Sequence, residues 1–239
     1  MCGKFTQMAS WAEVVAFSQA LGASPPGPES SNDAVLTSTP MRLAHIIRLA
    51  ADGRREAVPM RWGFVDHHPG ACDIPKHMHA RAETIDRLPT FSAAFAERRA
   101  ILLVGSFNEG EEVPVHYDDG EPSGRLWTRQ WTLRARDSAP LAFAVVWETA
   151  SVQGRPLPTF VQVTTPANAL IAPITDRMPA FLDPADWAVW LGETPARPPE
   201  VKALLRTHND AGAWEMTVEN PAKKPPRPRN PKPKPGGLI

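Results

Sequence analysis

Seven prolines between Pro221 and Pro235 set the limit of the part of this chain that can fold. Proline fixes φ and has no backbone N–H to donate, so a segment this rich in proline can form neither a helix nor a central strand. We therefore predict a folded domain over residues 1–220 and an extended, disordered tail over residues 221–239. We find no internal repeat and no second linker within the domain.

Charge divides the chain at the same place. The whole sequence has 26 basic and 26 acidic residues, but the tail has no acidic residue, so residues 1–220 carry a formal charge of −6. A basic, extended tail can hold a polyanion loosely through the release of counterions. The alternative is a disordered end that only keeps the protein in solution. The basic residues of the tail are Lys223, Lys224, Arg227, Arg229, Lys232 and Lys234.

The remaining composition excludes several classes of protein. Apolar residues make up 42% of the 239 residues, which is ample for a packed core. No apolar run approaches the roughly 18–20 residues that span a bilayer, and no signal-peptide pattern is present, so we expect a cytoplasmic protein with no membrane partner. The two cysteines, Cys2 and Cys72, cannot form a disulfide framework and indicate a reducing compartment.

Three stretches predict local structure around helices. Ser10 and Glu13 form a capping box for an amphipathic helix that ends near Leu21, and a loop follows over Ser24–Asp33. A second helix is expected over Thr90–Arg98. Asp183 and Pro184 provide a cap and a first-turn proline for a third helix ending near Leu191, on which Trp187 and Trp190 share one face.

Strand patterns outnumber these helices and do not alternate with them. Asp52-Gly53 predicts a hairpin turn between two of the strands. This order favours an α+β fold, in one domain with a curved, mostly antiparallel, barrel-like sheet flanked by short helices. The expected strands are Leu43–Ala51, Glu56–Phe64, Ala100–Phe107, Leu126–Leu133, Leu141–Trp147, Thr159–Thr164 and Trp214–Val218.

Cys2 is the first candidate for chemistry. It directly follows the initiator Met1, and removal of Met1 would leave an amine and a thiol on the same terminal residue. Both groups titrate near enough to pH 7 to be partly nucleophilic. An aldehyde can form a Schiff base with the amine and then close onto the sulfur as a thiazolidine ring. Taken alone, a cysteine at this position is more often incidental.

Further short motifs accompany Cys2 in a fixed order. They are Met1-Cys2-Gly3-Lys4-Phe5, Arg61-Trp62-Gly63-Phe64, Ala80-Arg81-Ala82-Glu83-Thr84, Arg98-Arg99-Ala100-Ile101 leading to Ser106-Phe107-Asn108-Glu109, and Thr164 with Asp176-Arg177-Met178-Pro179. In this order they resemble the SOS-response-associated peptidase (SRAP) family, which includes the abasic-site processing proteins. The resemblance spans about Cys2 to Leu182.

The resemblance implies an enzyme of the DNA damage response that captures abasic sites in single-stranded DNA. Cys2 would bond covalently to the open deoxyribose as a thiazolidine, and Glu109 would move protons. The resemblance also implies an autopeptidase activity that removes the initiator methionine. It implies no cofactor and no resident metal, and we expect a monomer that associates with the nucleoid when bound to DNA. The expected DNA contacts are Lys4, a partly exposed Trp62, Arg81, Thr164 and Arg177. Trp62-Gly63 resembles the start of the family's loop that presents a base-stacking wedge.

Four positions depart from the family pattern. Lys4 occupies a position where the family usually has arginine, so the positive charge is kept but bidentate hydrogen bonding is lost. Gly110 occupies a position where the family has an aromatic residue. Thr175 replaces a histidine that assists proton transfer, and threonine does not titrate near pH 7. His79 replaces an asparagine and could compensate in part. Two alternatives therefore stay open: a weakened SRAP domain that only binds single-stranded DNA, and a thiol autopeptidase or hydrolase that uses Cys2.

Two candidate residues also have purely structural interpretations, and one further cluster could bind a metal. Glu109 could be part of a solvated acidic turn with Glu111 and Glu112, and Arg81 could form a structural ion pair with Glu83 or another carboxylate. A group of histidines and one cysteine contains ligands that zinc prefers, but its spacing matches no standard zinc signature, and a DNA-facing polar loop is favoured. That group is His67, His68, Cys72, His77 and His79, with Asp66 and Asp73 among them.

Overall fold

A computed structural model describes residues 4–7, 37–66, 72–117 and 120–219. The predicted helix Ser10–Leu21, the loop Ser24–Asp33 and the tail after Asn220 lie outside these described residues. Cys2 lies outside them as well. The description of the fold and of the candidate site rests on the described part of the chain.

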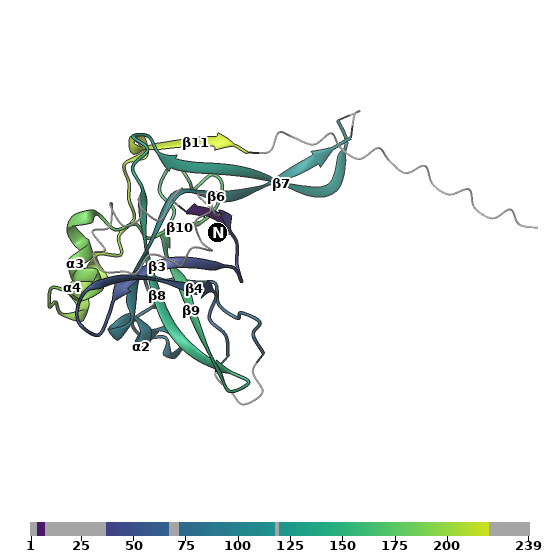
Figure 1. The fold of residues 1–239 in the computed structure, drawn as a ribbon. Helices are drawn as coiled ribbons and strands as arrows, with labels where there is room; N and C mark the ends of the chain where they lie inside the picture. Colours follow the sequence, from purple (N-terminus) through teal and green to yellow (C-terminus); the bar gives the residue numbers. More distant parts are fainter. Residues whose placement is uncertain (1–3, 8–36, 67–71, 118–119, 220–239) are drawn as a thin grey trace, which may run out of the picture.

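A single mixed sheet dominates the described structure (Figure 1). Most neighbouring strands are antiparallel, and β4 and β5 each pair in parallel with β9. The pairing runs from β9 through β4, β3, β6 and β8 and back to β9, so these strands form a closed ring of hydrogen bonds. The strands are β1 Lys4–Gln7, β2 Thr37–Ser38, β3 Leu43–Leu49, β4 Arg55–Trp62, β5 His79–Arg81, β6 Arg99–His116, β7 Pro122–Ala135, β8 Leu141–Val152, β9 Arg155–Pro166, β10 Arg177–Pro179 and β11 Trp214–Val218.

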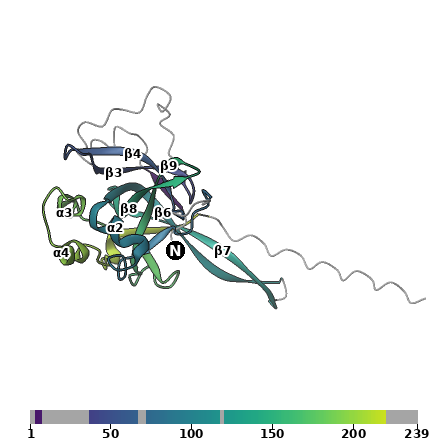
Figure 2. The ribbon, with the colours of Figure 1, turned by 90° about the horizontal axis from the view of Figure 1, so that it is seen from below.

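The predicted sheet-dominated fold is confirmed, and two of its strands are longer than expected. The turn between β3 and β4 falls at Gly53, whose φ of 80° suits glycine. The predicted ends of two strands were wrong: the strand expected to end at Phe107 continues to His116, and the strand expected to begin at Leu126 begins at Pro122. β6 and β7 pair as far as His116 and Pro122 and leave the body as a two-stranded arm (Figures 1 and 2). Cross-strand pairing extends these strands through polar residues that carry little strand signal of their own.

Two buried clusters lie on alternate residues of β6. Ile101 and Leu103 belong to one cluster, and Ala100, Leu102 and Val104 belong to the other. This alternation follows from the two-residue period of a strand, and it gives β6 apolar partners on both faces. The first cluster takes in the buried side chains of the helices, and the second takes in most of the aromatic residues near β1 and β11.

Short helices cover the sheet on the side away from the arm (Figure 2). The helix α2, Pro89–Glu97, agrees with the prediction for Thr90–Arg98. A 3₁₀ turn, Pro184–Asp186, leads into α3, Trp187–Leu191, which buries both of its tryptophans as predicted. Asp183 stands at the N-cap and Pro184 in the first turn, as predicted, but the Asp183 carboxylate pairs with Arg206 and makes no capping hydrogen bond. The helix α4, Pro198–Ala203, and a second 3₁₀ turn, Ala211–Ala213, were not predicted. Among the described helices, none combines the length and the apolar character needed to cross a bilayer.

Candidate functional site

The strand β1 brings the start of the chain to the middle of the molecule. Lys4 lies opposite Asn108 of β6, and Phe5 lies opposite Phe107 with no exposed surface. Paired strands lie about 5 Å apart, so Lys4, where the described part of the chain begins, lies beside the segment of β6 that contains Glu109.

Glu109 is a buried carboxyl group at this point of β6. Its side chain has 0% exposure, and burial raises its pKa from 4.5 to about 7, with the negative charge of Asp176 adding to the rise. Desolvation disfavours the charged form, which explains the direction of the shift. A carboxyl that titrates near neutral pH can both give and take a proton there. The interpretation of Glu109 as part of a solvated acidic turn was therefore wrong.

Asp176 connects Glu109 with the segment around β10. Thr175 and Asp176 immediately precede β10, and Asp176 acts on the pKa of Glu109 through its charge. Thr175 is half-buried, and its backbone N–H donates to the carbonyl of Ile171 at 3.1 Å. The structure thus brings together Glu109 and the segment with Thr175 from distant parts of the sequence.

Arg177 of β10 is buried in an ion pair. Its two terminal nitrogens donate to the carboxylate oxygens of Glu83 at 2.5 and 2.8 Å, and Nη2 also donates to the carbonyl of Thr164 at 2.6 Å. This bidentate bond lowers the pKa of the Glu83 carboxyl. Because only 7% of Arg177 is exposed, its guanidinium contacts Glu83 and β9 rather than solvent. Direct phosphate contact by Arg177 would require Glu83 to give way.

Arg81 is placed differently. It lies on β5 opposite Thr164 of β9, and its side chain is exposed. The alternative that Arg81 pairs with Glu83 was wrong, because Glu83 pairs with Arg177. In the described part of the chain Arg81 forms no ion pair, although its charge helps to lower the pKa of the Glu83 carboxyl, and its exposed guanidinium can reach an anion in solvent. Thr164 is 2% exposed, and its hydroxyl donates to the carbonyl of Ala80 at 3.5 Å.

The expectation that Trp62 is partly exposed was wrong. Its side chain is fully buried, its indole N–H donates to the carbonyl of Met78 at 2.9 Å, and its ring lies 5.1 Å from that of Phe5. His79, which is half-buried, meets the same indole edge-on at 5.7 Å. An indole enclosed in this way cannot stack on a base. Its ring contacts instead hold β1 and β5 against β4.

The histidine group is only partly described. His67 and His68 lie outside the described residues, and Cys72 is exposed. His77 packs edge-on against Phe91, whereas His79 packs against Trp62. Over the described ranges, no three His, Cys, Asp or Glu side chains gather as they would around a metal ion.

Sequence reasoning overlooked three residues that shape the site. Glu83 anchors Arg177, although the two are 94 positions apart. Trp131 lies opposite Glu109 across the β6–β7 pair, and the buried amide of Asn108 donates to Thr132 at 2.8 Å. Glu83 and Asn108 belong to the recognised motifs, and this was the sequence signal that could have identified them. Nothing in the local sequence marked Trp131 as a neighbour of Glu109.

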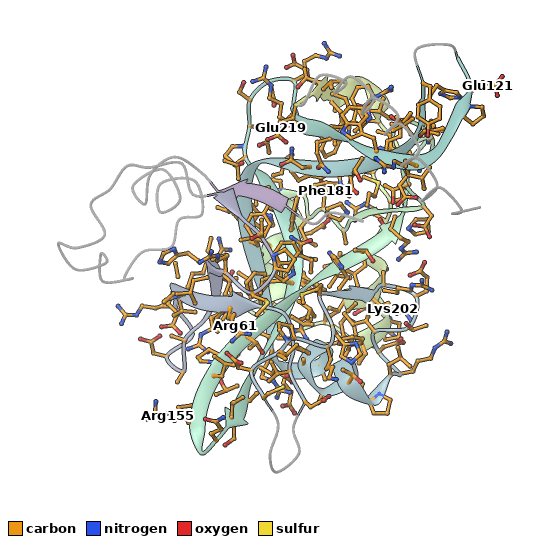
Figure 3. The ribbon with its side chains drawn as sticks, turned by 90° about the vertical axis from the view of Figure 1, so that its right-hand side faces the viewer. Arg61, Glu121, Arg155, Phe181, Lys202 and Glu219 are labelled. Atoms are coloured by element: carbon orange, nitrogen blue, oxygen red, sulfur yellow. The ribbon has the colours of Figure 1, made fainter. Side chains whose placement is uncertain are left out.

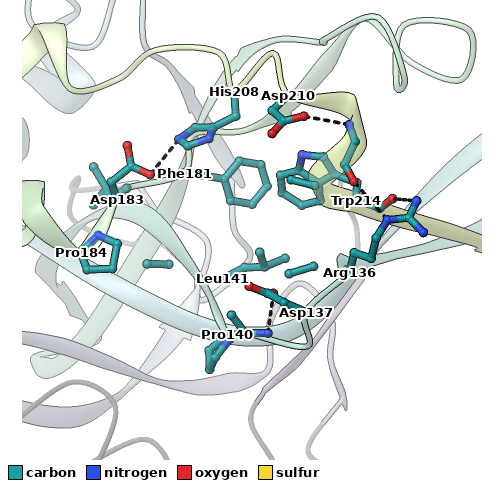
Figure 4. Close-up of a pocket in the computed structure, with 16 residues that line it drawn as sticks. Arg136, Asp137, Pro140, Leu141, Phe181, Asp183, Pro184, His208, Asp210 and Trp214 are labelled. Atoms are coloured by element: carbon teal, nitrogen blue, oxygen red, sulfur yellow. Dashed lines mark hydrogen bonds and ion pairs between the residues drawn. The ribbon is translucent and has the colours of Figure 1, made fainter.

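A cavity of about 450 Å³ lies apart from these residues (Figure 4). Phe181, Leu141 and Trp214 form its apolar walls, and Asp137 and Asp210 stand at its edge. Neither Glu109 nor any residue of the Arg177 ion pair lines it. All three aspartates that line it are engaged: Asp137 and Asp210 accept from the backbone N–H groups of Ala139 and Gly212, and Asp183 pairs with Arg206. The candidate site is therefore the region around Glu109 rather than this cavity.

Sequence comparisons identify the family of this chain. The model of the SOS response associated peptidase (SRAP) family matches residues 1–221. The chain is 26% identical to the abasic site processing protein YoqW of Bacillus subtilis (strain 168), over 95% of this chain and 97% of that protein. It is 28% identical to the abasic site processing protein YoaM of the same organism, over 91% of each chain.

Solved structures share the fold. A protein from Bordetella bronchiseptica superposes with a TM-score of 0.70 at 19% identity, covering 92% of this chain and 100% of that one. A protein from Bacteroides thetaiotaomicron gives the same TM-score and identity, covering 91% of each chain. The predicted single, sheet-dominated domain with few short helices is thus confirmed.

Proposed function

Because the chain belongs to the SOS response associated peptidase family, we propose that it processes abasic sites in DNA and does so by covalent capture through Cys2. Its relatives YoqW, YoaM and YobE are named abasic site processing proteins. The substrate in this proposal is an abasic site in single-stranded DNA, whose open deoxyribose presents an aldehyde. The observation that carries the proposal is the buried Glu109 carboxyl beside the strand that leads to Cys2.

The reaction joins an aldehyde to an aminothiol with loss of one water. The amine of Cys2 adds to the aldehyde carbon, and water leaves to give a Schiff base. The sulfur then bonds to the same carbon while its proton moves to nitrogen, which closes a thiazolidine ring. No oxidant or reductant is needed.

Glu109 fits the proton transfers of this sequence. With a pKa of about 7, the carboxyl is protonated in about half of the molecules at neutral pH. The protonated form can give a proton to the departing hydroxyl, and the carboxylate can take one from the attacking amine. A solvated glutamate with a pKa near 4.5 would be deprotonated at neutral pH. It could take the proton from the attacking amine but could not give one to the departing hydroxyl.

Arg81 and the Arg177–Glu83 pair have separate parts in the proposal. The exposed Arg81 guanidinium would bind a phosphate next to the lesion. The Arg177–Glu83 pair would hold β10 against β9 and so position Thr175 and Asp176 near Glu109. Arg177 is a positioning residue in this account.

The test is a denaturing gel of the protein mixed with an oligonucleotide that contains one abasic site. The wild type should give a slower band that survives denaturation, and Cys2→Ala should not, because alanine keeps the amine but lacks the sulfur that closes the ring. Borohydride should still trap the Cys2→Ala Schiff base. Equal bands from Cys2→Ala without borohydride would remove Cys2 from the mechanism.

Thr175 supports a second candidate function, a single-stranded DNA-binding module with weak capture. A threonine offers no group that titrates near pH 7 where the family has a histidine. Retarded bands in native gels with no band in denaturing gels would favour that module. Cleavage of a peptide by Cys2 without any effect of DNA would favour the thiol hydrolase.

A further inference from the structure

The β6–β7 arm presents two different faces. Paired residues of an antiparallel ladder point to the same side, and sides alternate along each strand. Four alternate residues of β7 therefore share one side, which we call the arm face: Arg125, Trp127, Arg129 and Trp131. Their partners on β6 are Val115, Val113, Glu111 and Glu109.

The arm face leads directly to the candidate site. Trp131, at its inner end, lies opposite Glu109, and Arg125, at its outer end, is exposed. Figure 3 shows the arm projecting from the body, with Glu121 at the outer end. A ligand lying along the arm face would therefore lie next to the segment of β6 that contains the buried Glu109.

Local contacts fix the inner part of the arm face. The indole N–H of Trp131 donates to the carboxylate of Glu111 at 2.9 Å, and Arg129 pairs with the same carboxylate at 3.3 Å. The Arg129 guanidinium lies 5.9 Å from the Trp131 ring. Glu111 thus orients one ring and one cation side by side, which limits the freedom that a ligand would have to restrict.

Alternating cations and indoles match the chemistry of a single nucleic-acid strand. Alternate residues of a strand are about 7 Å apart, so the two indoles stand about 14 Å apart with a guanidinium between them. Bases stack on aromatic rings without regard to sequence, and arginines follow the phosphates. The opposite side of β7 has Leu126, Thr128 and Gln130, which provide neither a ring nor a cation.

We propose that the arm face binds the single strand that flanks the lesion, by stacking on Trp127 and by phosphate contacts from Arg125 and Arg129. The proposal rests on the proposed function, because it places the strand next to the abasic site held at Glu109. A protein partner is the other occupant that such a face could take, but the alternation of cations with indoles and the continuity with Glu109 favour a nucleic-acid strand.

The test measures the affinity of the full chain for an intact 20-mer of deoxythymidylate by fluorescence anisotropy. Trp127→Ala should weaken binding by about 5- to 150-fold, the range expected for loss of one stacked base. Trp127→Phe should recover most of that loss. Arg125→Ala should reduce the slope of log K against log salt by about 0.7. The matched control is Leu126→Ala on the opposite side, where the side chain is 63% exposed, and it should stay within about twofold of the wild type.

Wild-type affinity in Trp127→Ala, or an equal loss in Leu126→Ala, would overturn the proposal. Unchanged affinity together with a lost protein partner would assign the arm face to that partner. The measurement is independent of the capture reaction because the 20-mer has no abasic site. If the wild type forms no adduct with an abasic strand but Trp127→Ala still loses affinity for the 20-mer, the capture proposal fails and the arm-face proposal stands.

Discussion

Replacing Glu109 with glutamine is expected to make the fold less sensitive to alkaline pH. In the folded protein the carboxyl titrates near 7, whereas in the unfolded chain it titrates near 4.5. The stabilising contribution is fully present below pH 4.5, where both states keep the proton, and it is lost as pH rises through 7. The full difference corresponds to about 3 kcal/mol, because each pKa unit is worth about 1.4 kcal/mol and the side chain is fully buried.

The assay is urea unfolding of the wild type and Glu109→Gln at pH 5 and pH 8. Between these two values the free energy of unfolding of the wild type should fall by about 2 to 3 kcal/mol more than that of Glu109→Gln. The absolute stability of the variant is not the readout, because a buried amide has its own cost at both pH values. Glu112→Gln is the matched control, since it removes an exposed carboxylate from the same strand. An identical pH dependence in wild type and Glu109→Gln would refute the account of a buried, hard-to-ionise carboxyl.

Three further perturbations test other parts of the structure. Glu83→Gln should lower the free energy of unfolding by about 1–3 kcal/mol in urea titrations, because it leaves the buried Arg177 with a weaker partner; unchanged stability would contradict the positioning role. Thr175→His should speed adduct formation in time-resolved gels, by less than the roughly 10²–10⁴-fold of a fully placed acid or base; a rate that is unchanged or slower from pH 6 to 8 would show that proton transfer uses another route. Truncation after Asn220 should weaken binding to intact and abasic strands alike and reduce the salt slope by up to about 4; an unaltered slope would exclude phosphate contacts by the tail.

The sequence predicted well where the signal is local. Asp52-Gly53 marked the β3–β4 turn, and the spacing of Trp187 and Trp190 marked the buried side of α3. The ordered motifs predicted that the segments around Glu109 and Arg177 come together, and Asp176 does lie close enough to act on the pKa of Glu109 through its charge. Each of these inferences depends on neighbours in the chain or on a family pattern, and the fold confirms that the segments meet.

The sequence could not predict features that depend on partners far along the chain. The polar outer half of β6 is a strand only because β7 pairs with it. Trp62 was assigned to a DNA surface on its motif alone, but Phe5 and His79 enclose it once β1 and β5 are in place. The choice of Arg177 rather than Arg81 as the partner of Glu83 depends on the register of β5 and β10 on β9. Such choices are fixed by tertiary geometry rather than by local sequence.

The intact mass of the mature protein, before and after incubation with an abasic single strand, tests covalent capture most directly. The account predicts a protein without Met1 and then a product whose mass is that of protein plus oligonucleotide less one water. The Cys2→Ala variant should show only the unmodified protein. A mature chain that keeps Met1 would have no aminothiol and would contradict the mechanism, as would a product of the predicted mass formed equally by Cys2→Ala.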